Sequence, residues 1–172
     1  MQWMIDTAHT TAAFKVRHMG ISNVRGSFSN VTGMVETDDA GRLVAVRATI
    51  PVDTVSTGNA DRDGHLKSPD FFDAAQFPVI EFVSTSVAPA AEGYAVQGDL
   101  TLHGVTRSVT LNIEVSAPVT DPMSGKQRLG GETTLDISRK DFGLTWNAAI
   151  EAGGVMVGDK VSITLEVEAV QG

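Results

Sequence analysis

Hydrophobic and polar residues alternate along several segments of this 172-residue chain. The longest such run follows Gly104, where one face would carry Val105, Val109, Leu111, Ile113 and Val115. A period of two is typical of a β-strand with one face in a hydrophobic core and one in water. The alternation predicts strands over residues 43–52, 94–103, 105–117 and 161–168, and a weaker form of it predicts strands over 4–6, 12–18, 24–37, 79–87 and 129–137.

Residues 60–77 are the one segment with a helical pattern, and Gly64 and Pro69 should limit it to short pieces. An antiparallel set of about eight strands leaves unpaired edges unless it closes into a barrel or pairs into a sandwich. Runs longer than ten residues, such as 24–37 and 105–117, favour a tall barrel with interior space. We therefore expect an all-β fold, an eight-stranded antiparallel lipocalin-like barrel with short helical segments near residues 60–77.

The composition supports this fold and excludes several kinds of chemistry. Val, Ile and Thr together supply 46 residues, and such β-branched side chains favour strands over helices. The length predicts a single domain over residues 1–172. The absence of cysteine excludes disulfides, thiolate metal sites and cysteine nucleophiles. A net charge of −8 argues against nucleic acid as a partner, because an acidic surface repels phosphate.

The first residues, MQWMIDTAHT, lack the basic and apolar regions of a secretory signal. No run approaches the roughly 18 apolar residues of a membrane helix. For the sequence as given we expect no membrane span and a cytoplasmic location, or a periplasmic one if the sequence is a processed form.

The polar residues form no recognisable catalytic or metal-binding motif. The four histidines lack metal-ligand spacing, and no GxSxG nucleophile motif is present. Residues 61–65, DRDGH, resemble the start of a calcium loop, but Leu66 stands where that loop needs glycine, which favours a local Asp–Arg network. His18 continues the face of Phe14 and Val16 and should point inward, as a hydrogen-bonded histidine, a ligand contact or a metal ligand.

Aromatic side chains are spread over separate segments rather than gathered in one stripe. They comprise Phe14, Phe28, Phe71, Phe72, Phe77, Phe82, Phe142 and Trp146. Two interpretations stay open at this point. The rings either form an ordinary core or line a dry tunnel.

Ten short motifs resemble those of the YceI-like, polyisoprenoid-binding family, in the expected order and along nearly the whole chain. They are DTAH at 6–9, FKVRH at 14–18, VRGSF at 24–28, GMV at 33–35, VSTG at 55–58, RDGHL at 62–66, DFFD at 70–73, FP at 77–78, GDLTLHGVT at 98–106 and SRKDFG at 138–143. Thr10 departs mildly from the serine that is common after the first motif. The resemblance implies a lipocalin-like barrel that binds a long apolar chain without catalysis, with no cofactor and no metal, and it suggests a homodimer.

The implied ligand is a polyisoprenoid, an isoprenoid quinone or a fatty-acid derivative, which the protein would bind, sequester or transport. The expected lining consists of Phe14, Val16, His18, Phe28, Phe82, Leu100, Leu102, Phe142 and Trp146. Phe71 and Phe72 are expected at the mouth, and Arg62, His65 and Arg139 are candidates for contacts to the ligand head. Two alternatives remain: an enzyme that uses His18 or His65 with a nearby Asp as an acid–base pair, and a stress-related structural or interaction barrel with a filled core.

Overall fold

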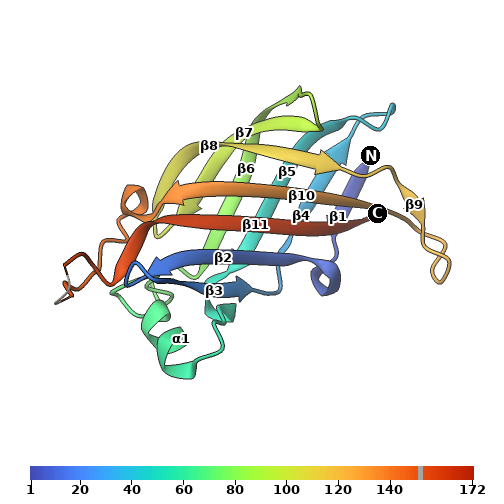
Figure 1. Cartoon of the computed structure of the whole chain (residues 1–172). Coiled ribbons are helices and arrows are strands. Elements are labelled where there is room, and N and C mark those ends of the chain that lie inside the picture. The colour runs from blue at the N-terminus through green and yellow to red at the C-terminus, as the bar shows by residue number, and fades with distance from the viewer. Residues whose placement is uncertain (151–152) are drawn as a thin grey trace.

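A computed structural model describes residues 1–150 and 153–172, most of which lie in antiparallel strands (Figure 1). The strands are β1 (Gln2–Ile5), β2 (Thr11–His18), β3 (Ser22–Phe28), β4 (Thr32–Thr37), β5 (Leu43–Pro51), β6 (Val79–Pro89), β7 (Tyr94–Leu102), β8 (Val105–Val115), β9 (Val119–Thr120), β10 (Gln127–Ser138) and β11 (Val157–Gln171). The helical elements are α1 (Ala60–Lys67) and the 3₁₀ turns η1 (Thr7–His9), η2 (Val52–Thr54) and η3 (Arg139–Phe142).

Eight strands close into a barrel, in the order β11–β1–β4–β5–β6–β7–β8–β10 and back to β11. The β10–β11 pairing closes the ring, with Arg128 opposite Val170 at one end and Ser138 opposite Lys160 at the other. Three strands lie outside this ring: β9 pairs with the start of β10, and β2 and β3 lengthen the wall. Strand β2 pairs with β11 between Val157 and Glu166, while β1 pairs with the last residues of β11. The expected eight-stranded antiparallel barrel is thus confirmed.

The barrel has two different ends (Figure 1). Both termini and β9 lie at one end, while η3 and the start of β11 lie at the other. Helix α1 lies below the barrel, beside β3 and toward that second end. At the outer edge of β3, Ser27 forms a β-bridge with Ser56 in the segment leading to α1.

The structure corrects one expected strand, reduces the expected short helical segments at residues 60–77 to one helix, and adds one short strand. Residues 24–37 do not form one strand, because the chain leaves the sheet after Phe28 and Asn30 adopts a left-handed conformation (φ 57°) before β4 begins. Helix α1 continues through Gly64 and ends ahead of Pro69, and turns rather than further helix follow it. The short strand β9, which pairs with the start of β10, was not expected from the alternation.

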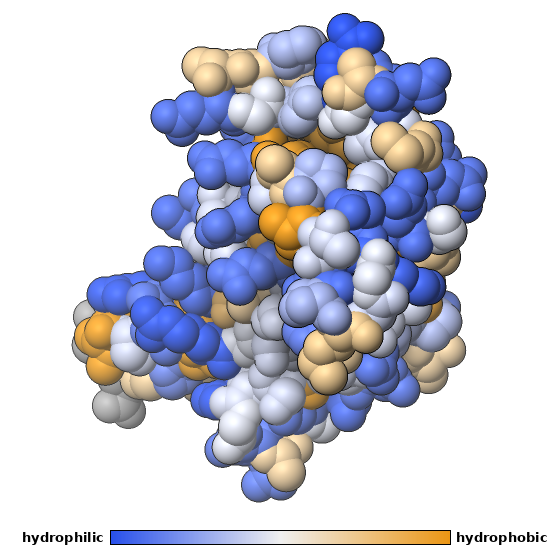
Figure 2. Space-filling model, turned by 90° about the vertical axis from the view of Figure 1, so that its right-hand side faces the viewer, coloured by the Kyte–Doolittle hydropathy of each residue, from blue (hydrophilic) through white to orange (hydrophobic). Residues whose placement is uncertain are grey.

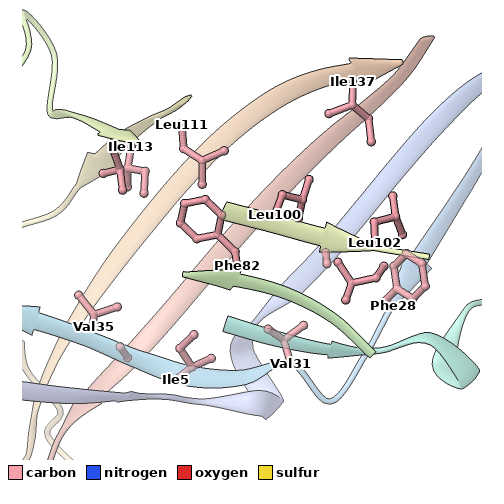
Figure 3. Packing of buried hydrophobic residues seen from close by; sticks show 14 of the residues in the cluster. Ile5, Phe28, Val31, Val35, Phe82, Leu100, Leu102, Leu111, Ile113 and Ile137 are labelled. Carbon is pink, nitrogen blue, oxygen red and sulfur yellow. The ribbon is translucent and has the colours of Figure 1, made fainter. Parts of the chain in front are cut away.

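Inward positions of the strands build one hydrophobic cluster inside the barrel, part of which is shown in Figure 3. Phe82 of β6 lies opposite Leu100 of β7, and Val96 of β7 lies opposite Leu111 of β8, so these side chains share the inner face. Directly opposed residues in an antiparallel pair point to the same side of the sheet. The period-two pattern of the sequence therefore becomes the inner wall of the barrel.

Candidate ligand-binding cavity

The hydrophobic cluster does not fill the barrel. A cavity of about 310 Å³ remains inside it, with walls contributed by strands β1 to β8 and by β10 and β11. Aliphatic side chains dominate the wall, among them Val46, Ile50, Leu111, Ile113, Leu135, Ile163 and Leu165. A cavity of this size and character falls at the lower end of the range found for small-molecule sites.

The structure brings almost all of the expected site residues to this cavity. Its lining includes Phe14, Val16, His18, Phe28, Arg62, His65, Phe71, Phe72, Phe82, Leu100, Leu102, Arg139 and Trp146. Phe142 does not line it: the side chain is buried in η3, and its carbonyl oxygen accepts a hydrogen bond from Nδ1 of His103 at 3.0 Å.

Sequence reasoning missed part of the wall. Val46, Ala48 and Ile50 of β5 all line the cavity, and their alternation was visible in the sequence. Leu144 and Met156 line it from the connection between η3 and β11, where no alternation exists to mark them. Periodicity identifies the strands of a cavity wall, whereas it gives no signal for the loops that close it.

Aromatic rings gather where the segment containing α1 meets the barrel. Phe14 and Phe28 lie 5.5 Å apart between ring centroids, and Phe28 lies 5.6 Å from Phe72 in an edge-on arrangement. The indole of Trp146 lies 5.3 Å from the ring of Phe71. The two long connections, residues 52–78 and 139–156, therefore meet through their aromatic side chains beside the cavity.

Arg62 is held by its own loop. Its Nε donates to Oγ1 of Thr57 at 2.7 Å, and one terminal nitrogen donates to the carbonyl oxygen of Thr57 at 2.8 Å. Asp63 fixes Thr57 in turn, because one carboxylate oxygen of Asp63 accepts hydrogen bonds from both the backbone N–H and the hydroxyl of Thr57. Asn59 caps α1 by accepting a hydrogen bond from the backbone N–H of Arg62. The network orders the loop as expected, but Arg62 and Asp63 meet through Thr57 instead of in a direct Asp–Arg pair.

His65 is paired with a carboxylate. Its Nε2 lies 2.9 Å from Oδ2 of Asp70, and its ring packs edge-on against Phe71 at 5.0 Å. His18 also lines the cavity, and among the described residues it has no hydrogen-bonding side-chain partner. The two histidines of the cavity therefore differ: one is oriented by an acid, and the other is available to a ligand.

Arg139 is a structural clamp rather than a free cation. Its guanidinium donates to the carbonyl oxygens of Leu144 at 2.6 Å, Gly158 at 2.8 Å and Val157 at 3.3 Å, and the residue is 3% exposed. Burial lowers the pKa of Arg139, an effect that the charge of Asp159 partly opposes. The clamp ties both ends of the connection between η3 and β11 to the barrel, so Arg139 has little capacity left for a ligand head.

The other end of the barrel carries an ion-pair network around Arg128. One terminal nitrogen lies 2.8 Å from a carboxylate oxygen of Asp6 and 2.6 Å from one of Glu168, while Nε donates to Asp121 at 3.0 Å. The hydrogen bond from Arg128 is the main reason that the pKa of Asp6 falls to about 2. Asp6, His9 and Glu168 lie close enough together to hold a metal ion, but Arg128 already supplies the positive charge there. Figure 2 views the molecule from this side and shows a largely hydrophilic outer surface with few hydrophobic residues.

Among the described residues, no helix combines the length and the hydrophobicity needed to cross a membrane.

Comparison with known proteins gives consistent results. The family model of the YceI-like domain matches residues 3–169. A UPF0312 protein of Staphylococcus aureus strain MSSA476 is 38% identical over 165 residues, which cover 95% of this chain and 94% of that protein. The crystal structure of the YceI protein of Campylobacter jejuni is 29% identical, with a TM-score of 0.76, and covers 91% of this chain and 90% of its own.

A third similar protein is a polyisoprenoid-binding domain from Saccharophagus degradans implicated in plant cell wall breakdown. It has a TM-score of 0.71 and covers 99% of this chain and 98% of its own. Its sequence is 18% identical, so the likeness concerns the fold. The match over residues 3–169 and the 38% identical relative show that this chain belongs to the YceI-like domain family.

Proposed function

We propose that the protein binds a long apolar chain, such as a polyisoprenoid, an isoprenoid quinone or a fatty-acid derivative, and sequesters or transports it without chemical change. The observation that carries the proposal is the cavity of about 310 Å³ with an almost wholly hydrophobic wall. An apolar cavity gains free energy when a hydrocarbon replaces the empty space or the poorly bonded water inside it.

The energetics of burial suit such a ligand. Each buried CH₂ group contributes about 0.8 kcal/mol, so a five-carbon isoprene unit contributes roughly 3–4 kcal/mol before the costs of association. Two or three units are enough for micromolar affinity once those costs of several kcal/mol are subtracted. The similarity in fold to a polyisoprenoid-binding domain agrees with this class of ligand.

A second candidate function is acid–base catalysis on the same ligand, and the His65–Asp70 pair is the observation in its favour. His65 lines the cavity, and a histidine oriented by a carboxylate is a common general base. However, Asp70 is half exposed, and the ring of His65 packs between Phe71 and Trp146. The surrounding wall offers few polar groups to stabilise a developing charge, so we favour binding over catalysis.

The test is organic extraction of the purified protein followed by mass spectrometry. We expect one class of long-chain lipid in a near-stoichiometric amount. The binding variant is Ala48→Phe, because Ala48 lines the cavity opposite Gly33 of β4, which has no side chain to compete for the space. This variant should fold and lose most of the lipid. Val44→Phe on the same strand is the matched control, because Val44 is 51% exposed and should leave the lipid content unchanged.

Two results would overturn the proposal. One is extraction without a stoichiometric lipid, combined with an unchanged melting temperature when isoprenoids or fatty amides are added. The other is recovery of a chemically altered ligand after incubation with the protein, with the original ligand recovered from His65→Gln. The second result would support the catalytic candidate instead.

A further inference from the structure

The charged residues that line the cavity are mostly basic, although the whole chain carries a net charge of −8. Among the described residues they are Arg17, His18, Arg62, His65 and Arg139, against one acid, Glu132. We propose that Arg62 selects a ligand whose apolar chain ends in an anionic head, a carboxylate or a phosphate. The inference rests on the proposed function, and it adds the class of head group and the residue that recognises it.

Among these residues, Arg62 is the one arginine that is both fixed in place and free to bind. Arg139 gives three of its five N–H groups to backbone carbonyls and is 3% exposed. Arg17 is exposed, as Arg62 is, but one hydrogen bond alone, to the carbonyl oxygen of Gly20, holds its guanidinium among the described residues. Arg62 gives two of its five N–H groups to Thr57. The other three face no hydrogen-bonding partner within the described part of the chain.

The hydrogen bonds to Thr57 prepare the guanidinium for recognition. A free arginine side chain loses rotamer entropy when it binds a ligand, whereas Arg62 has been ordered by the fold through Thr57 and Asp63. A guanidinium matches the geometry of carboxylate and phosphate oxygens, and its hydrogen bonds to them are about twice as strong as neutral ones. A primary amide or an alcohol at the same place carries no negative charge and would only replace the water that solvates this exposed guanidinium.

Two of the acidic groups near Arg62 in the sequence are already engaged. Asp63 accepts two hydrogen bonds from Thr57, and Asp70 is paired with His65. Asp61 occupies the exposed first turn of α1. His18 lines the same cavity and can donate to an anion as well. An anionic head would therefore meet the hydrogen-bond donors of Arg62 on α1 and His18 on β2. The apolar chain of the ligand would lie against the hydrophobic wall.

The experiment compares four ligands with the same sixteen-carbon chain: hexadecanoate, hexadecyl phosphate, hexadecanamide and hexadecanol. Their affinities are measured on delipidated protein by displacement of a fluorescent hydrophobic probe. We expect at least one of the two anions to bind tenfold or more tightly than both neutral ligands, a difference of about 1.4 kcal/mol. The two anions separate a carboxylate site from a phosphate site.

Variants test whether Arg62 causes the preference for anionic ligands. Arg62→Gln should reduce the preference for the anion to about twofold while leaving the affinity for hexadecanamide unchanged. Thr57→Val, which removes the hydroxyl that accepts from Nε, should give an intermediate preference. Arg25→Gln is the control, because Arg25 is exposed on β3 and does not line the cavity. An arginine that only orders its loop would change the melting temperature without changing the ratio of affinities.

The outcomes separate this inference from the function on which it rests. Equal binding of all four ligands by the wild-type protein overturns the role of Arg62 and leaves chain binding intact. A preference for anions that persists in Arg62→Gln also overturns it. No binding of any ligand in this set or in the extraction experiment overturns both.

Discussion

The ring of His65 packs edge-on against the indole of Trp146, with centroids 4.9 Å apart and planes at 84°. These residues come from α1 and from the connection between η3 and β11, which are about 80 positions apart in the chain. Phe71 contacts both rings, so three aromatic side chains join the two segments beside the cavity. A ligand that passes between these two segments must separate the ring of Trp146 from the rings of His65 and Phe71.

The position of Trp146 predicts an optical signal for binding. We expect its fluorescence emission to shift to shorter wavelength when an apolar chain enters, because the chain displaces water from the lining. The other tryptophan, Trp3, is 2% exposed, donates to the hydroxyl of Thr37 and does not line the cavity, so it should not respond. Titration of Trp146→Phe with the same ligand should show no shift while probe displacement still shows binding. A full shift in that variant would place the ligand elsewhere.

The sequence predicts the barrel well because the evidence for each strand is local. Alternation in 105–117 is enough to place Leu111 and Ile113 on the inner face, and the structure confirms that placement. The break between β3 and β4 leaves no such trace, because it depends on the backbone of Asn30, a residue type that is common in turns and in loops of every kind.

The polar part of the site is less predictable because its partners are distant in sequence. Arg128 meets Asp6 across 122 positions, and the carbonyl partners of Arg139 lie on a loop and on the start of β11. The motif containing Arg139 suggested a contact to the ligand head, but only the fold shows that the side chain is buried and that three of its N–H groups bond backbone carbonyls. Arg62 differs because its partner Thr57 is five residues away, within the same motif region.

Gly98 gives a test of how the cavity wall is packed. A Cβ atom at this position would lie 2.4 Å from Cζ of Phe82 and 2.6 Å from the carbonyl oxygen of Val83. Gly98→Ala should therefore lower the free energy of unfolding by about 1–3 kcal/mol, and it should weaken ligand binding because the displaced ring of Phe82 moves toward the cavity. Urea unfolding of the delipidated protein measures the first effect and probe displacement the second.

The matched control is Gly64→Ala in α1, where a Cβ atom would meet nothing within 4 Å. This change should raise the free energy of unfolding by about 0.5–1 kcal/mol, because alanine favours the helix and restricts the unfolded chain. If both alanine variants were equally stable, the close packing of Phe82 on Gly98 would be refuted.

The network around Arg128 predicts a pH-dependent contribution to stability. The pKa of Asp6 falls from its ordinary value of 3.8 to about 2, and the hydrogen bond from Arg128 is the largest cause. A carboxyl group with a lowered pKa stabilises the fold above the unfolded-state value, and this contribution is lost as the pH falls through the folded-state value. The stability difference between wild type and Arg128→Gln should therefore be largest near neutral pH and shrink between about pH 4 and pH 2.

Asp121 provides an internal comparison for this prediction. Its pKa is also lowered to about 2, but the backbone N–H of Met123 is the largest cause and remains in the variant. NMR titration of Arg128→Gln should show the pKa of Asp6 rising more than that of Asp121. A stability difference that stayed constant from pH 7 to pH 2 would contradict the coupling between Arg128 and Asp6.

Arg139 yields the prediction that links stability to ligand retention. Its removal leaves the carbonyl oxygens of Leu144 and Gly158 without this donor, while that of Val157 keeps a hydrogen bond from Nδ2 of Asn147. Arg139→Gln should therefore lower the free energy of unfolding by about 2–4 kcal/mol. The same change frees the connection that carries Trp146, so a bound ligand should dissociate faster while its association rate changes little. Lys140→Gln is the control, since it removes only an exposed ion pair with Asp159 and should change stability by less than about 0.5 kcal/mol. Stopped-flow displacement measures both rates. A large loss of stability with an unchanged dissociation rate would mean that the ligand does not leave past this connection.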